Sequence, residues 1–582
     1  SSALAATRFQ NLLEEADMTI AGQSNEVTRR DLLVGAAGAL AASLAQASPA
    51  LADGATVSGV VFEDRSGAGT RQDGDPGVAD VLVSNGKDVA ITDDAGRYVL
   101  PLPDEATIFV IKPSGYMPPV DPGSMLPRFY VHHQPKGSPD SLGLAFQGIP
   151  PTPPLPASLD FPLRRQDEPR AFEVVLFTDP QPESAAEVDF IREDVVDALI
   201  GTKAKFGITA GDIMFDDLSL YERYNKIIAT IGLPWWNVAG NHDLNYEAPD
   251  RRYSRETFKR VFGPNYHAFC YADALFVMLD DVDYLGADAS RSHAAGKYEG
   301  RIDAAQLEFV RNVLARTPPE KLIVLIMHIP LRNDLDPAAT DTNLTNRDAL
   351  FALLEGRRFT VSFSGHTHTT EHHYFDAAAG WKGPEPHHHH VMTAVSGSWW
   401  SGPFDHRGVA AADSRDGSPN GFHMLAVDGN RYRTWFVPAK EPNGRQMRIS
   451  IDGAFHRDQR EVMREFRQGQ LLTSPISRDG VAATSIIANV FDGGPKTKVA
   501  MTIGERAPMA MKRVRMPDPF VDEVFTRNQA TKKAWVKAEP SSHIWTARLP
   551  ADLSAGTHRV TVEAVTEYGD TVRGRIALEV TG

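Results

Sequence analysis

Cysteine is nearly absent from the chain, with Cys270 as the only one among 582 residues. No disulfide can form within such a chain, and no zinc site can be built from several thiolates. Cys270 lies in the apolar run AFCYADALFVML, where no neighbouring charge favours the reactive thiolate. We therefore interpret it as a core residue rather than as a catalytic nucleophile.

Positive charge is also scarce. The 60 Lys and Arg residues are outnumbered by 75 Asp and Glu residues, and the net charge is -15. Proteins that bind nucleic acid need clustered basic residues to contact the phosphate backbone, so we do not expect nucleic acid as the main partner. A small anionic substrate remains compatible with this charge, because a bound metal ion can supply local positive charge.

The N-terminal segment has the pattern of an export signal. Arg29 and Arg30 precede a run of small and apolar residues that closes on the triplet ALA at 50–52. A charged start, an apolar stretch and a small-residue end are typical of a cleaved signal peptide. The arginine pair resembles that of a twin-arginine signal. A single membrane anchor is the alternative, since the run is nearly long enough to span a bilayer.

We predict that residues 1–52 form this signal peptide with an upstream extension, and that translation begins at Met18. The mature chain would begin at about Asp53, keep no stable transmembrane anchor, and be periplasmic or secreted. The sequence leaves its oligomeric state open.

Three regions follow that differ in their hydrophobic period. Residues 53–168 alternate short apolar runs with Asp, Gly and Pro turns, as in a β-sandwich, and include a Pro-rich connector at about 113–157 that should be extended. Residues 169–440 alternate strands with helices, which indicates α/β layers. Residues 441–582 return to alternating strands and predict a C-terminal all-β domain. The first region resembles prealbumin-like modules.

Two helices of the α/β region have their own start signals. Ser184 with Glu187, and Asp303 with Gln306, have the spacing of a capping box, and apolar residues follow each pair at helical spacing. We predict helices that begin directly after Ser184 and Asp303.

Five apolar strands of the α/β region end in residue types that bind metals. These residues are Asp179 and Gln181, Asp212, Asn241 with His242 and Asp243, His328, and His366 with His368. One such residue at a strand end is commonly a cap or part of a turn. Side chains beyond the carboxyl ends of strands converge on one crevice in an open α/β sheet, so five together predict a metal site.

The motifs DPQ, GDIMFDD, GNHD, MHIP and GHTH, in this order, resemble those of the calcineurin-like metallophosphoesterases. The resemblance covers residues 172–437. It implies an α/β catalytic domain built as a four-layer αββα sandwich, here flanked by the prealbumin-like β-sandwich and the C-terminal all-β domain. It also implies hydrolysis of a phosphate ester at two divalent metal ions.

The resemblance also implies the ligands. One metal ion would be held by Asp179, Gln181, Asp212 and His368, and the other by Asp212, Asn241, His328 and His366. Asp212 would bridge the two ions. Two close cations clamp a phosphoryl group and lower the pKa of a water molecule between them. Mn²⁺ is the expected ion, with Mg²⁺, Fe and Zn²⁺ as alternatives.

Gln181 departs from the family pattern, which generally has His at this position. An amide binds a metal only through its carbonyl oxygen, so Gln181 makes the site richer in oxygen and shifts its preference from Zn²⁺ toward Mn²⁺ or Mg²⁺. The alternative is a degenerate site that has lost one metal ion.

His242 and Asp243 are the candidate catalytic residues. The resemblance implies that His242 stabilises or protonates the leaving oxygen and that Asp243 orients its ring; a positioned acid of this kind contributes roughly 10²–10⁴ in rate. Asp243 as a helix N-cap is the alternative. Asp216 and Asp217 are either outer contacts of the site or exposed loop acids.

Two further patterns lie after the last motif. The run His387–His390 is either part of a pocket or an exposed loop, and it could bind a metal ion opportunistically. Adjacent Trp399 and Trp400 on a strand would point to opposite faces, so only one of them can line the pocket.

The sequence thus predicts an exported phosphoesterase that hydrolyses a small phosphate mono- or diester with metal-activated water. A pyrophosphohydrolase of nucleotide-type substrates is one alternative. A non-catalytic binding protein on a degenerate phosphoesterase scaffold is the other.

Overall fold

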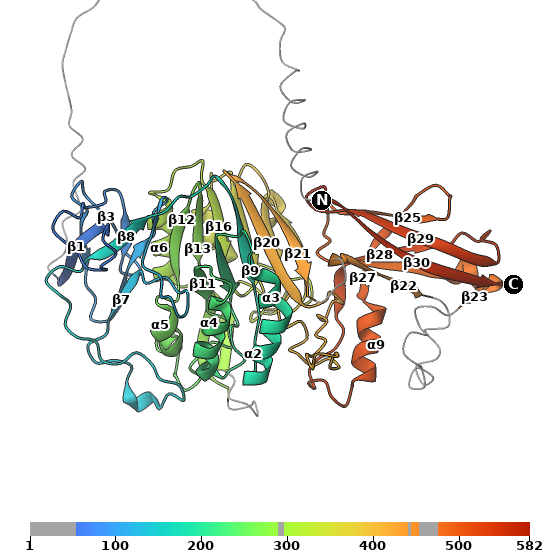
Figure 1. Ribbon diagram of the computed structural model, residues 1–582, viewed down its shortest axis with the longest axis horizontal. Helices are drawn as coiled ribbons and strands as arrows, with labels where there is room; N and C mark the ends of the chain where they lie inside the picture. The colour runs from blue at the N-terminus through green and yellow to red at the C-terminus, as the bar shows by residue number, and fades with distance from the viewer. Residues whose placement is uncertain (1–53, 289–295, 440–443, 453–474) are drawn as a thin grey trace, which may run out of the picture. The chain divides into compact units, whose positions relative to one another are not determined.

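The computed structural model describes residues 54–288, 296–439, 444–452 and 475–582 (Figure 1). Residues 53–582 form one compact unit. The predicted signal peptide, residues 1–52, lies outside the described residues. Within the described ranges, no helix is long and apolar enough to cross a bilayer.

The first region has two four-stranded sheets, with the orders β4-β1-β8-β6 and β3-β2-β5-β7. Its strands are β1 (Thr56–Glu63), β2 (Leu82–Ser84), β3 (Val89–Ile91), β4 (Arg97–Pro101), β5 (Ala106–Ile111), β6 (Tyr116–Met117), β7 (Tyr130–His133) and β8 (Phe161–Arg165). Residues 113–157 were predicted to be an extended connector rather than part of the folded domain. This is wrong in part, because β6 and β7 lie in this segment and belong to the two sheets, where β7 pairs with β5 and β6 pairs with β8. The resemblance to prealbumin-like modules stays a prediction.

The α/β region contains a five-stranded sheet with the order β11-β10-β9-β20-β21. Its strands are β9 (Ala171–Phe177), β10 (Phe206–Ala210), β11 (Trp235–Val238), β20 (Gly421–Asp428) and β21 (Arg431–Pro438). Strands β9, β10 and β11 are parallel, so their carboxyl ends meet at one edge. This edge carries the first three sequence motifs.

The second sheet has six strands in the order β12-β13-β16-β17-β19-β18. They are β12 (His267–Tyr271), β13 (Ala274–Met278), β16 (Leu322–Ile326), β17 (Thr360–Ser364), β18 (Glu371–Phe375) and β19 (His387–Val391), and a separate hairpin joins β14 (Val282–Ala287) to β15 (Gly296–Gly300). Strands β16 and β17 are parallel, and they carry the last two motifs at their carboxyl ends.

Helices cover the first sheet because side chains of β9 alternate between two cores. Val175 and Phe177 share a core with Val188 and Ile191 of α2, whereas Val174 and Leu176 point to the core shared with the six-stranded sheet. The helices that share this first core are α2 (Ala185–Ile191), α3 (Asp197–Leu199), α4 (Tyr221–Ala229) and α5 (Glu256–Phe262), whereas α6 (Ala304–Leu314) and α7 (Arg347–Leu353) pack in the core of the six-stranded sheet. In Figure 1, α2 and α4 lie together beside β9 and β11.

Both predicted helix starts are confirmed. The Ser184 side chain accepts a hydrogen bond from the Glu187 amide, and the Asp303 side chain accepts one from the Gln306 amide. The second capping box is incomplete, because the Gln306 side chain binds the backbone of Asp280 instead. The helix after Ser184 continues through the π-helical turn Arg192–Val196.

The C-terminal region has two more sheets, with the orders β22-β24-β28-β27 and β23-β30-β29-β25-β26. Its strands are β22 (Met447–Asp452), β23 (Ile476–Ser477), β24 (Ser485–Val490), β25 (Lys498–Ile503), β26 (Met509–Ala510), β27 (Lys512–Pro517), β28 (Pro540–Arg548), β29 (Gly556–Val565) and β30 (Thr571–Thr581). The all-β expectation is wrong in one respect, because helix α9 (Pro519–Arg527) follows an Asp518 cap with Pro in its first turn.

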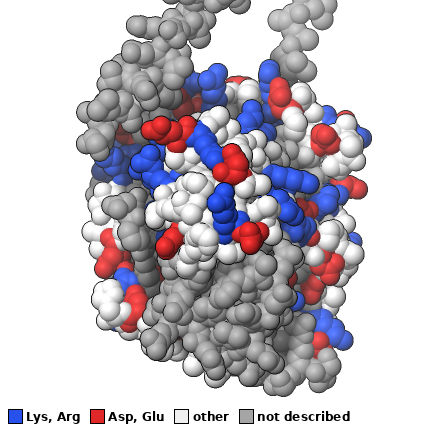
Figure 2. Space-filling view, turned by 90° about the vertical axis from the view of Figure 1, so that its right-hand side faces the viewer, with Lys and Arg blue, Asp and Glu red and all other residues white. Residues whose placement is uncertain are grey.

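The surface of this region shows no segregation of charge on the face drawn in Figure 2. Basic and acidic side chains are interspersed on that face among the described residues. Such a mixed surface is typical of a soluble domain.

The histidine run His387–His390 lies in neither of the predicted places. It forms most of β19, and each of its four side chains is at most 3 % exposed. The run is therefore part of the protein interior, and the prediction of a pocket or an exposed loop is wrong.

Candidate metal centre

The seven predicted ligands lie together beyond the carboxyl ends of five strands. Asp179 and Gln181 follow β9, Asp212 follows β10, Asn241 follows β11, His328 follows β16, and His366 and His368 follow β17. A ligand atom from each of Asp212, His328 and His366 lies within 4.8 Å of the other two. The strand ends thus bring together residues that are far apart in the sequence.

Each of the three histidines is held by a backbone carbonyl. Nδ1 of His328 donates to the carbonyl of Ala210 at 3.0 Å, and Nε2 of His366 donates to the carbonyl of Asp341 at 3.0 Å. Nδ1 of His368 lies 2.5 Å from the carbonyl of Gly397. A carbonyl can only accept, so the second nitrogen of each neutral ring carries a lone pair, which is the arrangement found in metal-bound histidines.

These second nitrogens point at the other predicted ligands. Nε2 of His328 lies 3.0 Å from Oδ1 of Asn241, 3.2 Å from Oδ2 of Asp212 and 3.2 Å from Nδ1 of His366. Nε2 of His368 lies 3.6 Å from Oδ1 of Asp179. Nitrogen and oxygen donors therefore converge in two adjacent groups, as expected for two metal ions.

The side chain of Gln181 is buried beside Asp212. Its Nε2 donates to Oδ2 of Asp212 at 2.7 Å, whereas its Oε1 is buried and has no hydrogen-bond partner among the described residues. A buried carbonyl oxygen without a partner costs about 1–3 kcal/mol, so the site favours a cation that this oxygen can bind.

Charge at the site also fits a bound cation. Burial raises the pKa of Asp179 to about 7, so the protein alone does not stabilise this carboxylate fully. Burial lowers the pKa of His366 and of His368 to about 3, so both rings are neutral, as metal ligands must be.

The backbone at the ligands is unusual. Asp179, Gln181, Asp212, His366 and His368 have φ angles of 49°, 39°, 49°, 74° and 52°, in the left-handed region. Non-glycine residues adopt this conformation at a cost of about 1–3 kcal/mol each and do so most often at functional sites. The left-handed turns direct these side chains away from the strand ends and toward each other.

Two motif glycines are required by close packing behind the ligands. A Cβ on Gly240, in GNHD, would lie 2.1 Å from Oδ1 of Asp212, and a Cβ on Gly365, in GHTH, would lie 1.6 Å from Oγ1 of Thr178. Any side chain at either position would displace the ligand-bearing loops.

The His242 ring is held by Asp216. Its Nδ1 lies 2.7 Å from Oδ1 of Asp216, which also accepts a hydrogen bond from the Tyr246 hydroxyl at 2.6 Å. Burial disfavours charge on His242, but the carboxylates of Asp212 and Asp216 outweigh burial and raise the pKa of His242 to about 9. These carboxylates thus favour the protonated ring, which can act as an acid.

The prediction that Asp243 orients the His242 ring is therefore wrong. The Asp243 carboxylate accepts hydrogen bonds from the backbone amides of Gly240 and Ile213 at 2.9 and 3.0 Å, and from the Tyr221 hydroxyl at 2.8 Å. It joins the loops after β10 and β11 and caps no helix of the described residues, so the alternative of a helix N-cap is wrong as well.

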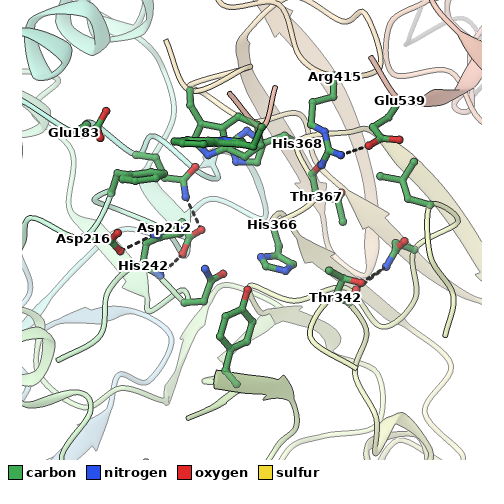
Figure 3. A pocket seen from close by; sticks show the side chains of 18 of the residues that line it. Glu183, Asp212, Asp216, His242, Thr342, His366, Thr367, His368, Arg415 and Glu539 are labelled. Carbon is green, nitrogen blue, oxygen red and sulfur yellow. Dashed lines mark hydrogen bonds and ion pairs between the residues drawn. The ribbon is translucent and has the colours of Figure 1, made fainter. Parts of the chain in front are cut away.

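The centre opens into a pocket of about 1200 Å³ (Figure 3). Gln181, Asp212, Asn241, His242, His366 and His368 line it from the α/β region. Trp535, Lys537 and Glu539, from the segment after α9, also line it. Arg415 lies at the pocket wall in an ion pair with Glu539, which Figure 3 shows as a dashed line. The C-terminal region thus contributes part of the pocket.

The two tryptophans do not lie on a strand. Trp399 and Trp400 lie in a turn with φ angles of 57° and 55°. Trp399 lines the pocket and stacks on His368 at 3.8 Å between ring centroids, whereas Trp400 belongs to the core around α2. Only one of them reaches the pocket, as predicted, but the turn and not strand alternation separates them.

Sequence reasoning missed several residues of the site. Asp281 accepts hydrogen bonds from the backbone amides of His328 and Ile329, at 3.1 and 3.2 Å, and so positions the loop after β16. Its position at the end of the apolar run ALFVMLDD was a usable signal. The pocket residues Trp535 and Lys537 have no comparable signal.

Comparison with known families gives three matches in chain order. The model for the N-terminal domain of calcineurin-like phosphoesterases matches residues 65–147, the calcineurin-like phosphoesterase model matches 173–370, and the model for the C-terminal domain matches 389–571. The chain belongs to the calcineurin-like phosphoesterase family. Membership supports a metal-dependent phosphoesterase with a dinuclear divalent metal centre.

Among solved structures, the chain is similar to the purple acid phosphatase PPD1 isolated from yellow lupin (Lupinus luteus) seeds. The two share 13% sequence identity with a TM-score of 0.33, over 61% of this chain and 67% of that chain. At this TM-score the likeness defines no residue correspondence. Among curated proteins, none matches the chain.

Proposed function

We propose that the chain is an exported phosphoesterase that hydrolyses a small phosphate mono- or diester at a centre of two divalent metal ions. One observation carries the proposal. Three histidines are each fixed by a backbone carbonyl. The second nitrogen of His328 lies next to Asp212 and Asn241, that of His366 next to His328, and that of His368 next to Asp179. The flanking β-domains would frame a four-layer αββα catalytic domain and its pocket.

Two bound cations would offset the charge of the phosphoryl group and lower the pKa of an attacking water molecule. Asp212 would be shared by both ions, because its Oδ2 lies 2.7 Å from Nε2 of Gln181 in one ligand group and 3.2 Å from Nε2 of His328 in the other. Its Oδ1 accepts a hydrogen bond from the backbone amide of His242 at 2.8 Å. Gln181 makes one site oxygen-rich, so Mn²⁺ is the proposed ion, with Mg²⁺, Fe and Zn²⁺ as alternatives.

His242 would give its proton to the leaving oxygen. Asp216 holds Nδ1, so Nε2 is the nitrogen that can donate. One face of the ring is covered by Phe215, which stacks on it at 4.5 Å between ring centroids. This contact leaves the ring little freedom to rotate, as general acid catalysis requires.

The pocket walls favour a substrate with a planar or apolar group beside its phosphate. Phe215 stacks on Trp535 at 5.9 Å between ring centroids, with an interplanar angle of 9°, and Trp399 lies nearby. Aromatic faces of this kind bind planar groups by stacking. The same observation favours the second candidate, a pyrophosphohydrolase of nucleotide-type substrates.

Turnover of p-nitrophenyl phosphate and of bis-p-nitrophenyl phosphate by the purified, Mn²⁺-loaded chain tests the proposal. We expect activity that EDTA abolishes and Mn²⁺ restores. A panel with a nucleotide pyrophosphate separates the two candidates. Stoichiometric metal binding without turnover of any of these substrates would instead favour the non-catalytic binding protein.

Export is proposed from Arg29 and Arg30. Changing both to Lys keeps their charge but removes the pair that twin-arginine export reads. We expect precursor to accumulate in the cytoplasm. Normal export of the Lys-Lys variant would point to another route or to a membrane anchor.

A further inference from the structure

A second group of buried histidines lies away from the catalytic pocket. His372 on β18, His390 on β19 and His423 on β20 surround Asp492, which lies in the turn after β24. The group therefore joins strands of both α/β sheets to the C-terminal region. None of its members lines the catalytic pocket.

One carboxylate oxygen faces three imidazole nitrogens. Oδ1 of Asp492 lies 2.8 Å from Nε2 of His390, 3.1 Å from Nε2 of His372 and 3.2 Å from Nε2 of His423. Ligand atoms of His372, His390 and Asp492 all lie within 4.8 Å of one another. Four ligands at about 2.0–2.1 Å from a tetrahedral zinc ion lie roughly 3.3 Å apart, so these distances are close to those of a zinc site.

Hydrogen bonding alone does not account for the group. Neither ring nitrogen of His390 has a hydrogen-bond partner among the described residues, although Nε2 is close to Asp492, and Nδ1 of His423 has none either. Both rings are fully buried. Buried unpaired nitrogens are costly, and such exceptions call for an explanation such as a bound ion.

His372 has the outer contact that a metal ligand needs. Its Nδ1 lies 3.0 Å from Nε2 of His388, and Nδ1 of His388 lies 2.9 Å from the Tyr432 hydroxyl. Nε2 of His372 lies 3.1 Å from Oδ1 and 3.2 Å from the backbone carbonyl of Asp492, so without a metal ion this nitrogen donates, and a cation would replace its proton. His388 and Tyr432 hold Nδ1 in the way that partners of metal-bound histidines do.

Asp492 itself is held in an unfavourable conformation. Its φ angle is 62°, in the left-handed region. Its side chain is only 11% exposed, and the charged groups placed around Oδ1 are the three imidazoles. The imidazoles compensate the buried carboxylate, and a divalent cation held by the same groups would do so in place of their protons.

We propose that His372, His390, His423 and Asp492 form a structural Zn²⁺ site that is separate from the catalytic centre. The ligand atoms of His372, His390 and Asp492 form one compact group, and His423, whose Nε2 lies 3.2 Å from Oδ1 of Asp492, would be the fourth ligand of a closed shell, as in structural rather than catalytic zinc sites. The ion would bind both α/β sheets to the C-terminal region, which supplies Trp535 and Lys537 to the catalytic pocket.

The test is the zinc content of the full-length chain in a background without the two carboxylates of the catalytic centre, compared between variants of the second site. The Asp179→Ala, Asp212→Ala double variant is equilibrated with Zn²⁺, dialysed against a weak chelator and measured by mass spectrometry of the metal. We expect one zinc ion per chain to remain. Adding Asp492→Asn should weaken zinc binding by more than about tenfold, the lower end of what losing an outer contact of a metal site already costs.

His389→Ala is the matched control for His390→Ala. His389 is the neighbour on the same strand and equally buried, but its ring contacts Ser362 and Ser364 on the opposite side. Zinc should be lost with His390→Ala and kept with His389→Ala. Co²⁺ in place of Zn²⁺ should show the visible absorption of a tetrahedral ion.

Two results would overturn the proposal. One is a folded double variant, checked by circular dichroism, that retains no zinc. The other is an Asp492→Asn variant that binds zinc as tightly as its parent, which would make the group a hydrogen-bonded ion pair.

Discussion

Two histidine-rich stretches of this chain, GHTH at 365–368 and HHHH at 387–390, differ in where the backbone places them. His366 and His368 lie beyond the end of β17, in left-handed turns that direct them into the catalytic pocket. The second stretch lies inside β19, where neighbouring side chains alternate between two buried faces. The position on the strand, rather than the residue type, therefore decides which histidines can reach a substrate.

The largest effect is expected at the strand ends. Asp212→Ala should reduce turnover by more than the roughly 10²–10⁴-fold that a general acid supplies, because it removes the ligand shared by both metal ions. The measurement is the rate with p-nitrophenyl phosphate under saturating Mn²⁺, with circular dichroism as the check of folding.

A strand-interior variant is the matched control. His387 is hydrogen-bonded to the hydroxyls of Thr360 and Ser362, at 2.8 Å each. His387→Ala should lower the free energy of unfolding, by about 1–3 kcal/mol for the Thr360 hydroxyl left unpaired, because Ser362 keeps its contact with His389. Its rate per folded molecule should stay near wild type. A similar loss of rate in Asp212→Ala and His387→Ala would contradict the claim that only the histidines beyond the strand ends serve catalysis.

The next effect is expected at His242. His242→Ala should lower the rate by roughly 10²–10⁴-fold with a poor leaving group and by much less with nitrophenolate, which needs no proton. Metal content should not change. An equal loss with both kinds of substrate would exclude His242 as the general acid.

Asp216→Asn sharpens this result, because Asp216 acts through His242. We expect a smaller loss of rate than with His242→Ala, and a fall in the kinetic pKa assigned to His242, since the Asp216 carboxylate raises that pKa. Asp217→Asn is the control. Asp217 caps the turn at Leu218–Leu220 through Ser219 and should leave the pH profile unchanged.

A moderate effect on metal choice is expected at Gln181. Gln181→His replaces an oxygen donor by an imidazole, so the ratio of bound Zn²⁺ to Mn²⁺ should rise after equilibration with both ions. An unchanged ratio would mean that Gln181 does not bind the metal.

The smallest effect is expected in the pocket wall. Trp535→Ala removes a stacking face contributed by the C-terminal region. We expect a higher KM for an aryl phosphate, with little change in kcat. With a small alkyl phosphate the KM should stay constant, and a uniform fall in kcat would contradict a role in substrate binding.

The seven residues that converge at the candidate metal centre could be predicted from the sequence because each lies in a short motif directly after an apolar strand. The partner of His242 could not be chosen in the same way, since Asp216 and Asp243 are both close to it in the loops and only the folded geometry separates them. The start of helix α9 could have been predicted from Asp518 followed by Pro519, but the strand patterns on both sides favoured an all-β domain.

The buried histidine run and the pocket wall depend on contacts between distant segments. His387 is buried because Thr360 and Ser362 supply its hydrogen bonds from the neighbouring strand. Trp535 reaches the pocket because the C-terminal region packs there, and no local pattern encodes such a contact.

The most direct test of the central claim is anomalous X-ray scattering from crystals of the full chain grown with Mn²⁺. We expect two manganese peaks, both within coordination distance of the Asp212 carboxylate, with Gln181 binding one ion through Oε1. A single peak, or two peaks that do not share Asp212, would contradict it.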